Sequence, residues 1–212
     1  MPDLSVENLH VFRGDRHLLK GLSLVVSSGC CLQVTGANGS GKTSLLRALA
    51  GLLQAESIEI HWQGRQVGVR DSDYLHSLAY LGHEAPLKAD LSGRENIRFA
   101  VGIRRPVSDR QLQAAFRRVD AAGFADRPVR SLSAGQRRRI ALAGLYLSGA
   151  KLWLLDEPTT NLDAAGQQLV HSLIEERLAD EGCVIAATHQ DLGLAADRCR
   201  SLALGSFARG AA

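Results

Sequence analysis

The stretch Gly36-Ala37-Asn38-Gly39-Ser40-Gly41-Lys42-Thr43 decides the fold of this chain, because it fits the pattern G-x-x-x-x-G-K-[ST] at every position. Its glycines allow a turn tight enough for several backbone N–H groups to converge on one phosphate, at the positive end of a helix dipole. Lys42 is expected to reach the β- and γ-phosphates of a nucleotide, and the Thr43 hydroxyl is expected to ligate Mg²⁺. All eight residues are therefore predicted to bind nucleotide phosphate.

The segments around this loop alternate between strand and helix patterns. An apolar segment, 30–35, enters the loop, and leucines at helical spacing follow it over 45–53. Apolar runs at 152–155 and 184–187 enclose a helical pattern over 169–178. Strands that alternate with helices predict an α/β fold, here a P-loop NTPase with a mixed or parallel sheet covered on both faces.

Two further regions modify this core. Residues 4–35 and 57–82 carry short apolar runs typical of strands, which predicts an N-terminal antiparallel β region. Residues 87–147 are rich in Arg and Ala, with helical periodicity and punctuation by Pro and Gly, which predicts an inserted helical sub-lobe. We expect one domain over 1–212, with its core at about 1–86 and 148–206 and the sub-lobe at about 87–147.

Two acids end the apolar strand Leu152-Trp153-Leu154-Leu155-Asp156-Glu157. Ligands of open α/β sheets bind at the carboxyl ends of the strands. Asp156 is expected to hold Mg²⁺ through water, as the second acidic element of P-loop enzymes does. Glu157 is then placed to polarise the water that attacks the γ-phosphate, which makes it the predicted catalytic base.

A second candidate anion site lies in Leu132-Ser133-Ala134-Gly135-Gln136. Ser133, Gly135 and the start of the following helix offer a hydroxyl and backbone N–H groups to an anion. A single nucleotide needs only one such helix start. A second start suggests that it serves a nucleotide held by another copy of the chain.

In their order along the chain, these motifs resemble those of the ATP-binding cassette (ABC) ATPases. The phosphate loop at 36–43 (Walker A), the signature at 132–136, the acidic strand at 152–157 (Walker B), Asn161-Leu162-Asp163 and Thr188-His189 all occur in the family's sequence order. The signature departs from the usual Leu-Ser-Gly-Gly-Gln only at Ala134.

The resemblance implies a head-to-tail pair of cassettes, with ATP between the loop of one copy and Ser133, Gly135 and Gln136 of the other. It also implies that His189 contacts the γ-phosphate and orients the attacking water, and that Asp163 bridges the two copies. An aromatic residue near the N-terminus stacks on adenine in this family. Phe12 is the candidate for that role, and a core position is the competing interpretation.

The family normally carries a Mg²⁺-contacting glutamine where this chain has His83, nine residues before Ser92. An imidazole nitrogen offers the metal or its water a ligand, with a titration near neutral pH that glutamine lacks. His83 is thus a predicted metal ligand, and a surface-loop histidine is the alternative.

Composition excludes several other classes. The net charge of the 212 residues is only +3, which does not favour nucleic acid as a partner, and no apolar stretch is long enough to span a bilayer. The N-terminus does not resemble a secretory signal, so we expect the chain to stay in the cytosol. The four cysteines form no C-x-x-C motif and are expected to be buried, reduced thiols.

Among ABC cassettes, this short chain is similar to the ATP-binding subunits of bacterial cytochrome c maturation systems, described as haem-exporting ATPases. The likeness rests on Gly82-His83 in place of the usual glutamine and on Leu-Ser-Ala-Gly-Gln-Arg-Arg-Arg at 132–139. Trp62-Gln63-Gly64 and Thr188-His189-Gln190 add to it. It implies separate membrane-spanning subunits as partners, a position at the cytoplasmic face of the bacterial inner membrane, and no direct haem binding. A cassette for another cargo (lipid, lipoprotein or drug) and a soluble non-transport ABC ATPase are the alternatives.

Overall fold

The computed structural model describes residues 3–205, and it contains two sheets. The smaller sheet is antiparallel and has the strand order β2-β1-β4-β5. The long strands β1 and β2 form one hairpin. The strands β4 and β5 pair with each other and come from the segment after the phosphate loop. The bounds are Leu4–Arg13 for β1, Arg16–Val26 for β2, Ser57–Trp62 for β4 and Arg65–Val67 for β5.

The larger sheet is parallel, with the strand order β6-β7-β8-β3-β9. Every residue of β7 and β8 is buried, which explains why these strands read as continuous apolar runs instead of alternating ones. The bounds are Cys31–Thr35 for β3, Leu78–Leu81 for β6, Leu152–Asp156 for β7, Cys183–Ala187 for β8 and Cys199–Ala203 for β9.

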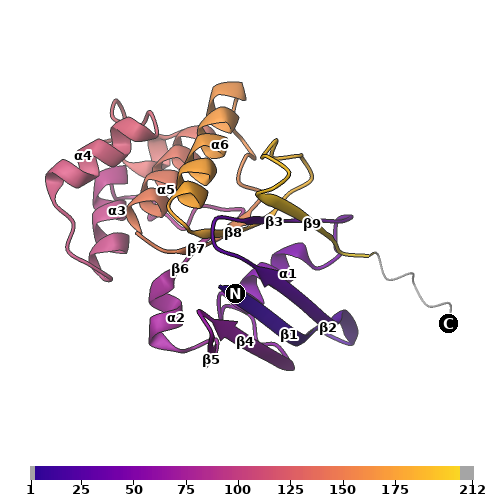
Figure 1. Cartoon of the computed structure of the whole chain (residues 1–212). Coiled ribbons are helices and arrows are strands. Elements are labelled where there is room, and N and C mark those ends of the chain that lie inside the picture. Colours follow the sequence, from indigo (N-terminus) through magenta and orange to yellow (C-terminus); the bar gives the residue numbers. More distant parts are fainter. Residues whose placement is uncertain (1–2, 206–212) are drawn as a thin grey trace.

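Helices cover both faces of the parallel sheet (Figure 1). Leu154 and Ile185 face α1 and the antiparallel sheet, whereas Trp153, Leu155 and Val184 face α5 and α6. Successive residues of one strand thus enter two different cores. The bounds are Lys42–Leu49 for α1, Ser72–Ser77 for α2, Gly93–Gly102 for α3, Asp109–Arg118 for α4, Val129–Ser131 for the 3₁₀ turn η1, Ala134–Leu147 for α5 and Ala164–Ala179 for α6.

Three helices of the predicted sub-lobe begin with the same capping box. Ser92, Ser108 and Ser133 each accept a hydrogen bond from the backbone N–H three residues on, and the Glu or Gln at that position reaches back to the serine N–H. This exchange satisfies two donors that a helix start leaves unpaired. Local sequence therefore sets where α3, α4 and α5 begin.

The sequence patterns missed two elements. The short helix α2 lies within 57–82, where only strands were expected, and β9 was not foreseen. Most of β9 is exposed at the edge of the sheet, so it has no apolar pattern to find. The division into a core and a sub-lobe stays a prediction, and the chain ends at 1–2 and 206–212 lie outside the described residues.

Candidate active site

The phosphate loop connects β3 to α1 and depends on glycine at two positions. Gly36 has φ 141°, and a Cβ atom there would lie 2.6 Å from the carbonyl oxygen of Leu204. Gly41 caps α1 with φ 106°, and a Cβ atom would lie 3.0 Å from Leu19. Only glycine adopts these angles without strain, so the loop pattern is a backbone requirement.

Lys42 begins α1 and points back across the loop. Its Nζ donates to the carbonyl oxygens of Gly36 at 2.7 Å and Ala37 at 3.3 Å, and lies 3.2 Å from Nε2 of His189. The side chain is buried. An ammonium group is thus held inside the loop where an anionic phosphate would be neutralised.

Thr43 and Asp156 meet although 113 positions separate them. The Thr43 hydroxyl donates to Oδ1 of Asp156 at 3.2 Å, while Asp156 Oδ2 is buried and has no hydrogen-bond partner among the described residues. A buried carboxylate oxygen without a donor is costly unless a cation binds it. Hard oxygen ligands of this kind suit Mg²⁺, so the residues present fit the metal predicted for this place.

Glu157 and His189 lie side by side at the ends of β7 and β8. The Glu157 backbone has φ 48° and donates to the carbonyl oxygen of Ala187 at 2.8 Å. Its Oε1 atom lies 3.5 Å from Nε2 of His189. A carboxylate, an imidazole and the Lys42 ammonium thus form one continuous polar cluster.

This cluster opens into a cavity of about 530 Å³. His83 also lines it, from the loop after β6, together with Asn38 and Gly39.

Phe12 is not one of the described residues that line the cavity. Its ring stacks on that of His17, with 4.1 Å between the ring centroids. Arg13 and Arg16, at the tip of the same hairpin, line the cavity instead, and sequence reasoning did not single them out. Adenine stacking by Phe12 stays a prediction.

The described residues that line this cavity do not include those of the predicted second anion site. Ser133 caps α5, and Gln136 completes its capping box. A Cβ atom on Gly135 would lie 2.9 Å from the Asn161 carbonyl oxygen. Asp163 caps α6 through the Gly166 N–H, and Arg139 donates to it at 3.3 Å. The chain brings these residues together at two neighbouring helix starts, apart from its own phosphate loop.

Arg138 is the main residue that sequence reasoning missed. It is buried in α5, and its guanidinium donates to the carbonyl oxygens of Gly82, Asp156, Glu157 and Pro158 at 2.6 to 3.2 Å. Burial lowers the pKa of the Arg138 guanidinium to about 10, although the negative charges of Asp156 and Glu157 act to raise it. The run Arg137-Arg138-Arg139 gave no hint of this, because a basic run is usually a solvated surface.

The cysteines agree only partly with the sequence prediction. Cys31 and Cys183 are buried, whereas Cys30 and Cys199 are half-buried. The neighbouring Cys31 thiol, acting as a hydrogen-bond donor to the Cys199 thiolate, lowers the pKa of Cys199. The expectation of four buried thiols was wrong for Cys30, which precedes β3, and for Cys199, because β9, which carries Cys199, is an edge strand.

Comparison with known proteins identifies the class to which this fold and site belong. The family model described as ABC transporter matches residues 19–160. An ABC transporter ATP-binding protein of Pyrococcus furiosus superposes with a TM-score of 0.80 at 24% identity, over 94% of this chain and 96% of that one. CbiO1 of Clostridium perfringens, part of an ABC transporter complex, gives a TM-score of 0.73 at 26% identity over 89% and 79%. The chain is a member of the ABC transporter ATP-binding proteins, with their fold, and is an ATPase.

Within this class, similarity to two relatives identifies a narrower family. The chain is 46% identical over 202 residues to the cytochrome c biogenesis ATP-binding export protein CcmA of Methylococcus capsulatus, covering 95% of this chain and 97% of the relative. It is 45% identical to CcmA 2 of Salmonella paratyphi A, over 95% and 96%. It therefore belongs to the family of cytochrome c biogenesis ATP-binding export proteins. In the region 3–205, no helix is long and apolar enough to cross a membrane.

Proposed function

We propose that this chain is the ATP-hydrolysing subunit of a membrane export complex that serves cytochrome c maturation. One observation carries the hydrolytic part of the proposal. Lys42, Asp156, Glu157 and His189 come from three neighbouring segments and line one cavity at the carboxyl ends of the parallel strands. Residues suited to phosphate binding, metal binding and base catalysis thus lie within one cavity.

Each residue has a distinct task in this proposal. ATP phosphates take the place of the loop carbonyl oxygens as partners of Lys42, and the loop N–H groups hold the same phosphates. Thr43, Asp156 and His83 would hold Mg²⁺, which would neutralise phosphate charge. Glu157 accepts a proton from the attacking water, and His189 orients that water beside the γ-phosphate.

A second copy of the chain completes each ATP site in this proposal. Ser133, Gly135, Gln136 and Asp163 lie outside the cavity that holds Lys42, and the helix start at Ser133 suits an anion. A two-fold arrangement then places two equivalent ATP molecules between the copies.

The dimer is tested with Glu157→Gln, which is expected to bind ATP without hydrolysing it. Light scattering should report a doubled mass when ATP is added. Adding Ser133→Arg should abolish the doubling, whereas adding Ala134→Gly, which restores the commoner signature, should preserve it. A Glu157→Gln chain that stays monomeric in saturating ATP contradicts the shared sites.

A groove of about 280 Å³ between α3, α5 and β6 is the proposed docking place for a cytoplasmic element of a membrane-spanning subunit. Ile97, Val101 and Leu145 form its apolar wall. Attachment to the inner membrane is assigned to this contact in the proposal. Ala100→Trp should fill the groove and reduce membrane recovery in cells that contain the partner, with ATPase activity retained. Ala114→Trp, on the exposed side of α4, is the matched control.

The cargo assignment rests on relatives named as cytochrome c biogenesis export proteins. The haem itself is expected to contact only the membrane subunits. The test is complementation of a bacterium that lacks its own maturation ATPase. Wild-type chain should restore covalent c-type cytochromes and Glu157→Gln should not. Restoration of lipid, lipoprotein or drug export instead would overturn the cargo assignment.

A further inference from the structure

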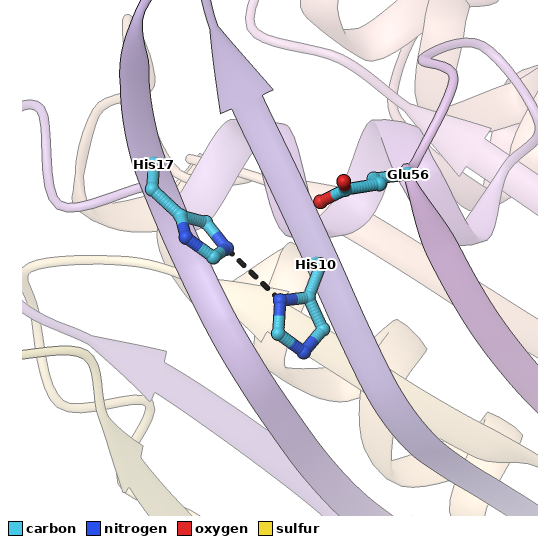
Figure 2. A group of neighbouring side chains, drawn as sticks. All are labelled: His10, His17 and Glu56. Atoms are coloured by element: carbon cyan, nitrogen blue, oxygen red, sulfur yellow. Dashed lines mark hydrogen bonds between the residues drawn. The ribbon is translucent and has the colours of Figure 1, made fainter.

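Three side chains of metal-ligating types lie close together outside the ATPase site. His10, His17 and Glu56 each offer a ligand atom, and these atoms all lie within 4.8 Å of one another. They come from β1, β2 and the residue before β4. Figure 2 shows the two imidazole rings turned toward each other and the Glu56 carboxylate extending toward them.

A bulge in β1 places His10 in this group. Leu4 and Val6 point into the core, and strict alternation would also bury residue 10. The strand pairing shifts between Val6 and Leu9, and Asn8 adopts φ 52°. The extra residue turns Leu9 inward and His10 outward, onto the face that carries His17.

Asn8 also fixes which nitrogen of His10 is available. The Oδ1 atom of Asn8 is an acceptor, so His10 Nε2, at 3.0 Å, donates its hydrogen to it. The neutral ring therefore carries its lone pair on Nδ1, which faces Nε2 of His17 at 3.0 Å. A metal-binding histidine typically has this arrangement, in which the other ring N–H is held by an oxygen.

The distances suit a small tetrahedral ion. Nitrogen ligands about 2.0–2.1 Å from Zn²⁺ in tetrahedral geometry lie roughly 3.3–3.4 Å apart, a few tenths of an ångström more than the His10–His17 spacing. The side chain of Glu56 is exposed and free to close the remaining gap, while its backbone N–H donates to the carbonyl oxygen of His10 at 2.9 Å. The third ligand is thus tied to the same strand as the first.

We propose that His10, His17 and Glu56 bind one divalent transition-metal ion, with Zn²⁺ as the best-suited ion, and leave a fourth position to water. Two neutral imidazoles and one carboxylate give a site of net charge −1, and imidazole favours Zn²⁺ over Mg²⁺. The bound ion joins β1, β2 and the start of β4. The site is separate from the Thr43–Asp156 pair and does not depend on the proposed function.

The test is calorimetric titration of the metal-stripped full chain with Zn²⁺, without nucleotide and with excess Mg²⁺ to occupy the ATPase site. The wild-type chain should take up one equivalent and unfold at a higher temperature when loaded. His17→Gln should lose uptake and the thermal shift, and the exposed Glu56→Gln, which leaves the fold intact, should weaken uptake tenfold or more. His76→Gln removes an exposed histidine of α2 and is the matched control.

Co²⁺ provides an independent readout. Nitrogen and oxygen ligands in a tetrahedral site give visible absorption without the thiolate-to-cobalt band that cysteine ligation would add. We expect this spectrum in the wild-type chain and in His76→Gln, and its loss in His17→Gln. The proposal is overturned if the wild-type chain takes up no zinc, if His17→Gln and Glu56→Gln bind as the wild type does, or if a thiolate band dominates.

Discussion

Arg138 in α5 donates a hydrogen bond through Nη2 to the backbone carbonyl oxygen of Glu157 at 2.8 Å. The same guanidinium holds the carbonyl oxygen of Asp156 at 3.1 Å and that of Gly82, beside His83, at 2.6 Å. Helix α5 begins at Ala134, directly after its N-cap Ser133. One side chain therefore connects the helix of the predicted second anion site to the backbone of both acids in the first.

Replacement of Arg138 should disturb both folding and catalysis. Arg138→Met keeps an unbranched chain but leaves buried carbonyl oxygens without donors, and each such group costs about 1–3 kcal/mol. We expect a loss of about 3 kcal/mol or more in urea unfolding, and a reduced kcat in the folded fraction. The exposed Arg110 on α4 is the control, since Arg110→Met should stay within about 0.5 kcal/mol. Equal stability of the two variants would refute the role of Arg138.

Replacement of Glu157 should separate binding from hydrolysis. Glu157→Gln keeps the size of the side chain but removes the base, so kcat should fall by about 10²–10⁴-fold. The affinity for ATP, measured by equilibrium fluorescence titration, should change little because Lys42 and the loop are intact. Unchanged turnover would mean that another group accepts the proton.

The pair formed by Thr43 and Asp156 should govern the magnesium requirement. Asp156→Asn removes the charge of a buried carboxylate whose Oδ2 has no partner among the described residues. We expect the Mg²⁺ concentration for half-maximal ATPase activity to rise at least tenfold. Asp109→Asn, at the start of α4, removes the same charge from an exposed residue away from the cavity and should leave the Mg²⁺ requirement unchanged. Identical magnesium curves for wild type and Asp156→Asn would exclude the assigned site.

His83 should contribute to the Mg²⁺ requirement of the enzyme. It lines the same cavity as Thr43 and Asp156 and offers an imidazole nitrogen to the metal or its water. His83→Ala removes this ligand and should raise the Mg²⁺ concentration for half-maximal ATPase activity. The comparison uses kcat and Mg²⁺ titrations of the two chains. A variant that reproduces the wild-type rate and metal dependence would leave His83 as a surface residue.

Cys199 should be the most reactive thiol in the folded chain near neutral pH. Only the thiolate reacts with alkylating reagents, and hydrogen bonding from Cys31 lowers the pKa of Cys199, whereas burial raises that of Cys183 to about 12. The fast alkylation phase should reach half its maximum at a lower pH than an ordinary thiol does. Cys199→Ser should remove this phase, and Cys31→Ala should move its midpoint upward. A midpoint near 9 in the wild-type chain would contradict the interaction.

The sequence was sufficient to predict the parts of the site that lie within short continuous segments. The loop at 36–43 needs glycine at fixed spacing because of backbone angles, so its pattern is visible without a structure. The same holds for the acids at the end of β7, because a fully buried parallel strand is continuously apolar up to Asp156. The fold class followed from the order of these strands and helices, and the solved relatives confirm it.

Other features depend on contacts between residues far apart in the chain. The order β6-β7-β8-β3-β9, which brings Thr43 to Asp156 and His189 to Lys42, is set by packing that no local pattern encodes. The edge strand β9 and the buried donor Arg138 were missed for the same reason.

The sequence alone therefore determined the phosphate loop, the acids and the α/β class, since backbone geometry and continuous burial leave a local trace. Only the tertiary structure decided that a bulge at Asn8 turns His10 toward His17 and Glu56, because the pairing of β1 with two other strands sets which face each side chain takes.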